Sequence, residues 1–278
     1  MRGSWLWPLL AAATGCNCAR APVVEPAPGA AVVAPAPAES VAARTARLRA
    51  EAQEAFAATR DRQGLEAALA AWKRVAPLGP EDHLVLAEAH WLQGAHFAAT
   101  PADAAAAFAE GARQAEEAMA LGAPAFATAR ATGASFDAAI ESLDGAATQG
   151  LRWFVRNQLG WAVATGRGTV VAQRPTLEVA IARLERAGEL GLDAEAALLR
   201  GELLAALPLA AGGDREASVA SIEKALALVA DASMQLRAAL AWKGDEARRL
   251  ALLEACAAAA SEAPASALAS TRAKSLLR

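Results

Sequence analysis

The sequence predicts an all-α protein made of stacked helical hairpins. Apolar residues make up 55% of its 278 positions, and most of them are alanine or leucine, which are strong helix formers. Tyrosine is absent, and no segment alternates apolar and polar residues as a half-buried strand does. Glycine and proline instead interrupt the apolar pattern at intervals of about one helix from residue 40 onward. The composition and the spacing of glycine and proline therefore both predict helices.

Residues 1–15 predict a signal peptide. One arginine precedes a short apolar run from Trp5 to Ala13, and small residues follow it. The run is shorter than the roughly 20 apolar residues that span a bilayer. The stretch at residues 13–16, ATGC, resembles the bacterial lipobox, although Ala13 stands where leucine is usual. The resemblance implies cleavage before Cys16 and acylation of that cysteine; the alternative is an ordinary cleaved signal with a spare cysteine.

Residues 16–39 predict a disordered tether rich in proline and alanine. Five prolines occur here without helical periodicity, a composition typical of a semi-rigid extended spacer. A tether after an acylated Cys16 would hold the folded part away from a membrane, and lasting attachment requires two or more acyl chains. We therefore expect a periplasm-facing protein that a lipid anchor holds on a bacterial membrane, with the inner and outer membranes both open.

Residues 40–278 are expected to form one helical repeat domain. The glycine and proline punctuation separates segments with helical periodicity, and no segment is long and apolar enough to cross a membrane. The expected helices are about 41–58, 63–76, 81–97, 101–120, 124–146, 149–165, 174–190, 193–206, 214–229, 231–241, 245–260 and 264–276.

Four connectors in this domain share one pattern. Each has a charged helix end, a leucine, usually a glycine that can close the helix, and then a proline or an acid that starts the next helix. The four leucines are Leu78, Leu121, Leu190 and Leu228. They lie 43, 69 and 38 residues apart, and a tetratricopeptide repeat has a unit of about 34 residues. The body thus resembles a tetratricopeptide-like array, an α-solenoid with a concave binding surface.

The middle of the chain adds a second resemblance. A long aromatic-bearing segment is followed by a glycine-rich turn and a helix that closes on a Leu-Gly connector. The matching residues are Leu151, Trp153, Asn157, Gly160, Trp161, Ala162, Gly166, Gly168 and the stretch from Leu184 to Gly191. This arrangement resembles the T component of TRAP transporters, the TatT family of periplasmic tetratricopeptide lipoproteins. The resemblance implies association with the extracytoplasmic solute-binding subunit of a transporter and assistance in handling a small organic or apolar ligand.

The candidate binding residues are Trp153, Arg156, Asn157 and Trp161. Their spacings of three, four and eight residues place them, with Gly160, along one stripe of a helix. Tryptophan and arginine together suit an organic ligand or a partner helix. The alternative is that the stripe is simply core, because large aromatic side chains are usually buried.

Several other functions find little support in the sequence. The net charge of −3 argues against a nucleic-acid partner. His83 and His90 are seven residues apart, which is too far for the usual helical pair of metal ligands. No serine elbow, Cys-His pair or phosphate loop is present. We therefore expect neither an enzyme, a metal nor a cofactor; the alternative to a transporter component is a general scaffold lipoprotein that binds proteins without a ligand.

Overall fold

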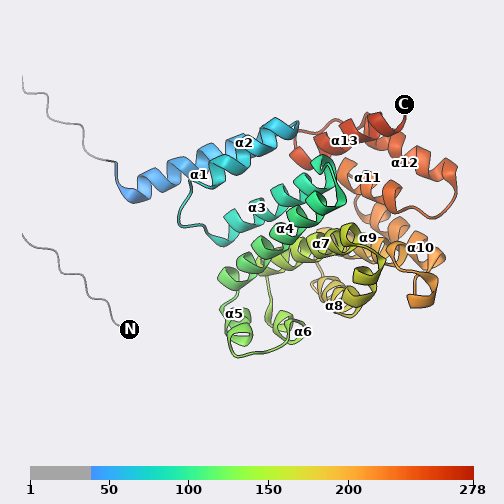
Figure 1. Ribbon diagram of the computed structural model, residues 1–278, viewed down its shortest axis with the longest axis horizontal. Helices are drawn as coiled ribbons and strands as arrows, with labels where there is room; N and C mark the ends of the chain where they lie inside the picture. The colour runs from blue at the N-terminus through green and yellow to red at the C-terminus, as the bar shows by residue number, and fades with distance from the viewer. Residues whose placement is uncertain (1–38) are drawn as a thin grey trace, which may run out of the picture. The chain divides into compact units, whose positions relative to one another are not determined.

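The computed structural model describes residues 39–278, of which residues 40–278 form one compact unit. This part of the chain contains thirteen α-helices and no strand, which confirms the all-α prediction (Figure 1). The predictions for the signal peptide, for Cys16 and for the tether up to residue 38 lie outside the described residues. The helices are α1 (Val41–Ala57), α2 (Arg62–Trp72), α3 (Pro80–Leu92), α4 (Pro101–Gly122), α5 (Pro124–Ala131), α6 (Phe136–Ala139), α7 (Ala147–Thr165), α8 (Arg167–Glu185), α9 (Leu190–Ala206), α10 (Arg215–Leu228), α11 (Ala232–Ala241), α12 (Glu246–Ala258) and α13 (Pro264–Leu276).

Most consecutive helices pack against each other in pairs. The pairs are α1 with α2, α3 with α4, α7 with α8, α9 with α10 and α11 with α12, and α13 packs on both α11 and α12. Local caps begin many of these helices: the Asp61 carboxylate accepts the Gly64 N–H at 2.8 Å, and Thr100 and Asp103 cap each other reciprocally. Such caps satisfy backbone N–H groups that the first helical turn leaves free.

The centre of the fold is the packing of α4 against α7, which small residues make possible. A Cβ atom at Gly111 of α4 would lie 2.2 Å from Oδ1 of Asn157, and one at Gly150 of α7 would lie 2.6 Å from the Met119 side chain. Neither position has room for a larger residue. The two helices can therefore approach closely, and the largest hydrophobic core of the described residues surrounds them.

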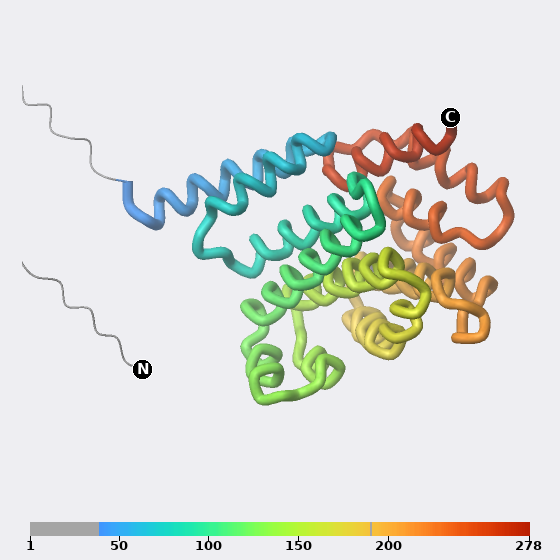
Figure 2. Tube along the Cα trace, viewed as in Figure 1, coloured from blue at the N-terminus to red at the C-terminus, as the bar shows by residue number. Residues whose placement is uncertain are grey.

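The single helix expected over about 124–146 is wrong. The chain forms α5, α6 and a 3₁₀ turn at Ile140–Ser142, and Figure 2 shows this segment folding back on itself before α7 begins. Gly133 and Gly145 adopt φ values of +88° and +44°, in the left-handed region that glycine tolerates best. Gly133 follows the end of α5 and Gly145 lies in the turn before α7, two breaks that alanine-rich periodicity alone does not reveal.

The helix expected over about 174–190 has different ends. It begins earlier, at Arg167, because Gly166 alone makes the turn with a φ of +129°, and it continues through Pro175. It stops at Glu185, before Gly188 with a φ of +70°. Leu190 and Gly191, which were expected to close a helix, begin α9 instead.

The last helix returns to the first part of the domain. Arg272 of α13 donates a hydrogen bond to the Ala95 carbonyl, and the Arg60 guanidinium donates to the Glu262 carbonyl at 3.0 Å. Figure 1 also shows α13 beside the start of α2. Arg272 and Ala95 therefore lie next to each other in the fold although they are about 180 positions apart in the sequence. Across residues 39–278, no helix combines the length and the apolarity that crossing a membrane requires.

Candidate functional site

The predicted stripe lies on α7, and most of it is buried. Trp153, Arg156 and Asn157 are 4%, 8% and 0% exposed. Trp161 is half-buried and packs against the main core. The structure thus brings the first three residues into the interior among α3, α4, α9 and α11, and their suggested role in binding stays a prediction.

Asn157 joins helices rather than facing a cavity. Its Nδ2 donates hydrogen bonds to the carbonyl oxygens of Trp153 at 2.9 Å and of Ala87, on α3, at 3.2 Å. Its Oδ1 has no hydrogen-bond partner and lies against Gly111 of α4. The side chain therefore links α7 to α3 and fills the close approach of α4.

Arg156 is the member of the stripe whose charged group is buried against aromatic rings. The central carbon of its guanidinium lies 3.7 Å from the ring centroid of Trp91 and 4.8 Å from that of Trp153. Its Nη2 donates to the Ser233 hydroxyl at 3.1 Å, whereas its Nε makes no hydrogen bond and lies 3.9 Å from the nearest oxygen of Glu195. Arg156 is thus a buried cation, stacked on tryptophan, with only a distant carboxylate.

The nearby carboxylates are bound mainly by Arg237 of α11. Arg237 Nη1 donates to Glu195 at 2.6 Å, and its Nε and Nη2 form a bidentate pair with Glu202 at 2.8 and 2.7 Å. Burial alone would raise the pKa of Glu195, but Arg237 and Arg156 outweigh it and lower the pKa to about 2. Burial, followed by the charge of Arg237, lowers the pKa of Arg156. Two buried arginines therefore share one buried glutamate.

A cavity of about 450 Å³ adjoins this network, since Arg156, Glu202 and Arg237 are among its lining residues. Its apolar wall includes Trp91, Phe108 and Leu159, and its charged residues come from α7, α9, α11, α13 and the loop after α11. Those charged residues are Arg156, Glu202, Arg237, Lys243 and Arg272. The Phe108 ring fits between Gly94 and Gly160, where a Cβ atom would lie 2.8 and 3.0 Å from it. Four cations and one carboxylate thus face a largely apolar space.

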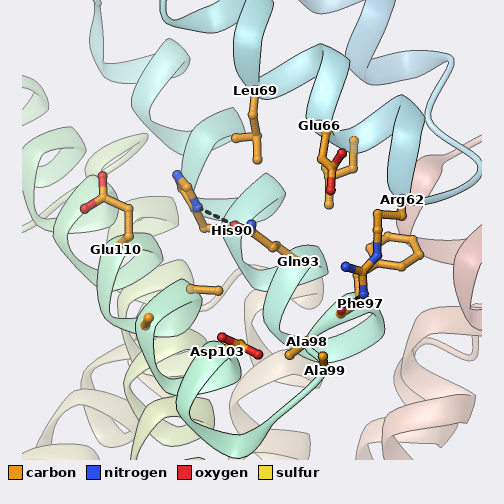
Figure 3. Close-up of a pocket in the computed structure, with 13 residues that line it drawn as sticks. Arg62, Glu66, Leu69, His90, Gln93, Phe97, Ala98, Ala99, Asp103 and Glu110 are labelled. Atoms are coloured by element: carbon orange, nitrogen blue, oxygen red, sulfur yellow. Dashed lines mark hydrogen bonds between the residues drawn. The ribbon is translucent and has the colours of Figure 1, made fainter.

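A second cavity, of about 490 Å³, lies between α2, α3 and α4 (Figure 3). Two of its carboxylates are already used within the fold: Asp103 caps α4, and Glu110 accepts from Arg113 and Gln114. Hydrogen bonding from Arg113, above all, lowers the pKa of Glu110 to about 2. His90 shares a hydrogen bond with Gln93 at 3.1 Å, and burial lowers its pKa. This cavity has no strongly buried charge without a partner.

Both cavities adjoin an irregular turn. A π-helix at Gln93–Phe97, labelled η1, continues α3, and its residues line the two cavities on opposite sides. Insertions of this kind in α-helices are frequent at functional sites. His96, within η1, packs edge-on against Trp91 with ring centroids 5.8 Å apart. Burial, with smaller effects of Arg272 and Arg156, lowers the pKa of His96 to about 3, so that this histidine is neutral at pH 7.

Sequence reasoning missed most residues of the α7 cavity. No role was inferred for Trp91, Glu195, Arg237 or Arg272. One signal was present: Glu195 stands between alanines and leucines on α9, a position where a charge is rarely buried unless it is paired. The pairing partners lie 42 and 39 residues away in the sequence, so spacing alone could not reveal them.

The described residues show no group of three or more His, Cys, Asp or Glu side chains that could hold a metal. His83, considered above as a ligand, instead shares a hydrogen bond with Gln114 at 2.7 Å. Cys256 is buried, and its thiol donates to the Ala232 carbonyl; burial, above all, raises its pKa to about 11. A thiol of this kind is a poor nucleophile at neutral pH.

No protein-family model and no curated protein sequence matches this chain.

Proposed function

We propose that the protein is a cell-envelope lipoprotein that binds a partner protein through its helical repeats. The partner is the extracytoplasmic solute-binding subunit of a transporter, as for the T component of TRAP transporters that residues 140–191 resemble. Helical pairs that curve until α13 meets Ala95 support this reading, because an α-solenoid offers a concave surface of that kind. The tetratricopeptide-like repeat is part of the same proposal.

One observation carries the proposal: the helices enclose a cavity whose lining includes a buried arginine, Arg156. A protein that only organised other proteins would need no internal space of about 450 Å³ lined by charges. Ligand pockets are typically about 300–1,000 Å³ and mostly apolar, with a few placed polar groups. A partner that hands over a small ligand accounts for both features.

Capture from the native host tests the partner. The full-length lipoprotein, tagged after Arg278, is crosslinked in cells and purified from the membrane fraction, and its partners are identified by mass spectrometry. We expect a solute-binding subunit as the main product, at near-equal molar amount. Recovery of many envelope proteins with no solute-binding subunit among them would refute the transporter role and favour the general scaffold.

The lipid anchor makes a separate prediction. Replacing Cys16 with serine removes the only thiol at the predicted cleavage site, and acylation requires that thiol. We expect complete loss of the acyl mass from the N-terminal peptide and release of the protein from the membrane fraction. Replacing Cys18 with serine is the matched control and should leave both unchanged. A Cys16→Ser protein that stayed acylated would show that Cys16 is not the anchor.

A further inference from the structure

The cavity on α7 has more positive charge than its own carboxylates neutralise. Five cations, Arg152, Arg156, Arg237, Lys243 and Arg272, line it or lie next to it, against Glu88, Glu195 and Glu202. Burial raises the pKa of Glu88, whereas the charges of Arg156 and Arg152 lower it to a smaller extent. Arg237 is satisfied by Glu195 and Glu202, so the excess charge resides on the other cations.

Three of those cations donate no hydrogen bond to a carboxylate of the described residues, although Arg156 has Glu195 at 3.9 Å. Arg156 is more than nine-tenths buried, and its single hydrogen bond goes to the neutral Ser233 hydroxyl. Arg272 donates to the Ala95 carbonyl, and Lys243 makes no ion pair with any other residue of the stretch 39–278. These three groups come from α7, α13 and the loop after α11, and all of them line the same cavity.

Most of the remaining lining of the cavity is apolar. Phe108, Leu159 and Val163 line it together with alanines of α9 and α11, and Leu240 is half-exposed at its edge. Burying an unpaired charge in such surroundings is costly unless a partner completes the pairing. An arginine fork pairs in a bidentate manner with a carboxylate, and the apolar wall would accept a hydrocarbon body.

We propose that this cavity binds a small organic acid, with its carboxylate on Arg156, Lys243 and Arg272 and its apolar body against Phe108 and Leu159. The inference rests on the proposed function, since it names the ligand class that such an accessory protein would handle. Of the four binding residues predicted from the sequence, it keeps Arg156, because Trp153, Asn157 and Trp161 do not line this cavity.

Calorimetric titration of residues 39–278, which include the compact unit described above, tests this proposal with decanoate as the probe. Decanol has the same chain without the charge, and acetate has the charge without the chain. We expect decanoate to bind at one site at least ten-fold more tightly than either. Binding of decanoate no tighter than that of decanol would overturn the proposal.

Amino-acid substitutions test which side chains bind the carboxylate of decanoate. The double change Lys243→Gln with Arg272→Gln is expected to raise the Kd for decanoate about ten-fold, because it removes charge-assisted contacts at the cavity rim. Arg167→Gln with Lys274→Gln is the matched control, since it removes the same charge from exposed positions of α8 and α13. Arg156→Gln should abolish binding, with circular dichroism as the check on folding. An unchanged Kd in the rim variant would refute the site.

The two proposals can fail separately. The titration uses purified protein without any partner, so loss of decanoate binding would leave capture of a solute-binding subunit unaffected. Conversely, absence of that subunit from the crosslinked material would not alter a Kd that depends on Lys243 and Arg272.

Discussion

Replacing Glu195 with glutamine is expected to lower the free energy of unfolding by an amount on the order of 3 kcal/mol. The change keeps the shape of the side chain but leaves Arg156 and Arg237 buried without the carboxylate that lies 3.9 and 2.6 Å from them. Removing one partner of a buried ion pair costs about 3–5 kcal/mol, because the remaining charge stays desolvated. Urea denaturation followed by circular dichroism measures the loss.

A surface pair provides the control. Glu185 pairs in a bidentate manner with Arg200 at 2.9 and 2.8 Å, but both side chains are about one-third exposed. Exposed pairs contribute about 0–1 kcal/mol, so Glu185→Gln should have little effect. Equal losses from Glu185→Gln and Glu195→Gln would show that the buried network is not specially important for stability.

The lowered pKa of Glu195 also predicts that its contribution to stability depends on pH. The pKa of Glu195, at about 2, lies below the ordinary value, so its ionised form stabilises the folded state. This contribution is complete above the pKa of an unfolded glutamate and is lost as the pH falls towards 2. The difference in stability between the natural protein and Glu195→Gln should therefore be largest near pH 6 and much smaller near pH 3. A difference that did not change with pH would contradict the assignment.

Replacing Gly111 with alanine is expected to destabilise the packing of α4 against α7 by about 1–3 kcal/mol, as for other overpacked cores. The added methyl group would lie 2.2 Å from Asn157 Oδ1. Asn157 is fully buried and bonded to the carbonyl oxygens of Ala87 and Trp153, so it cannot move without losing those bonds. Thermal and urea denaturation measure the change.

Two further variants test the cause. Gly168→Ala introduces the same methyl group in the first turn of α8, where nothing lies within 4 Å, and should stabilise the protein by about 0.4–1 kcal/mol. The double variant Gly111→Ala with Asn157→Ala removes the clash, so its loss should be smaller than the sum of the two single losses. Strict additivity would mean that Asn157 is not the obstacle.

Local sequence signals located most helices but not all of their ends. Proline and glycine at the start of α3 and α4 predicted their first residues within one position, because these residues act within a single turn. The segment over about 124–146 was predicted as one helix because alanine favours helix wherever it stands. The breaks depend on glycines that adopt left-handed φ, and a glycine can equally remain within a helix, as Gly111 does.

The sequence by itself determined the all-α class, most of the helices and the helical face that carries Trp153, Arg156 and Asn157, because these depend on composition and on spacings within one helix. Only the tertiary structure decided what that face meets. Arg156 reaches Trp91, Ser233 and Glu195 on three other helices, and α13 returns to complete a cavity with Arg272. Such contacts join residues tens to nearly two hundred positions apart, and the curvature that brings them together arises from the packing of all the helices.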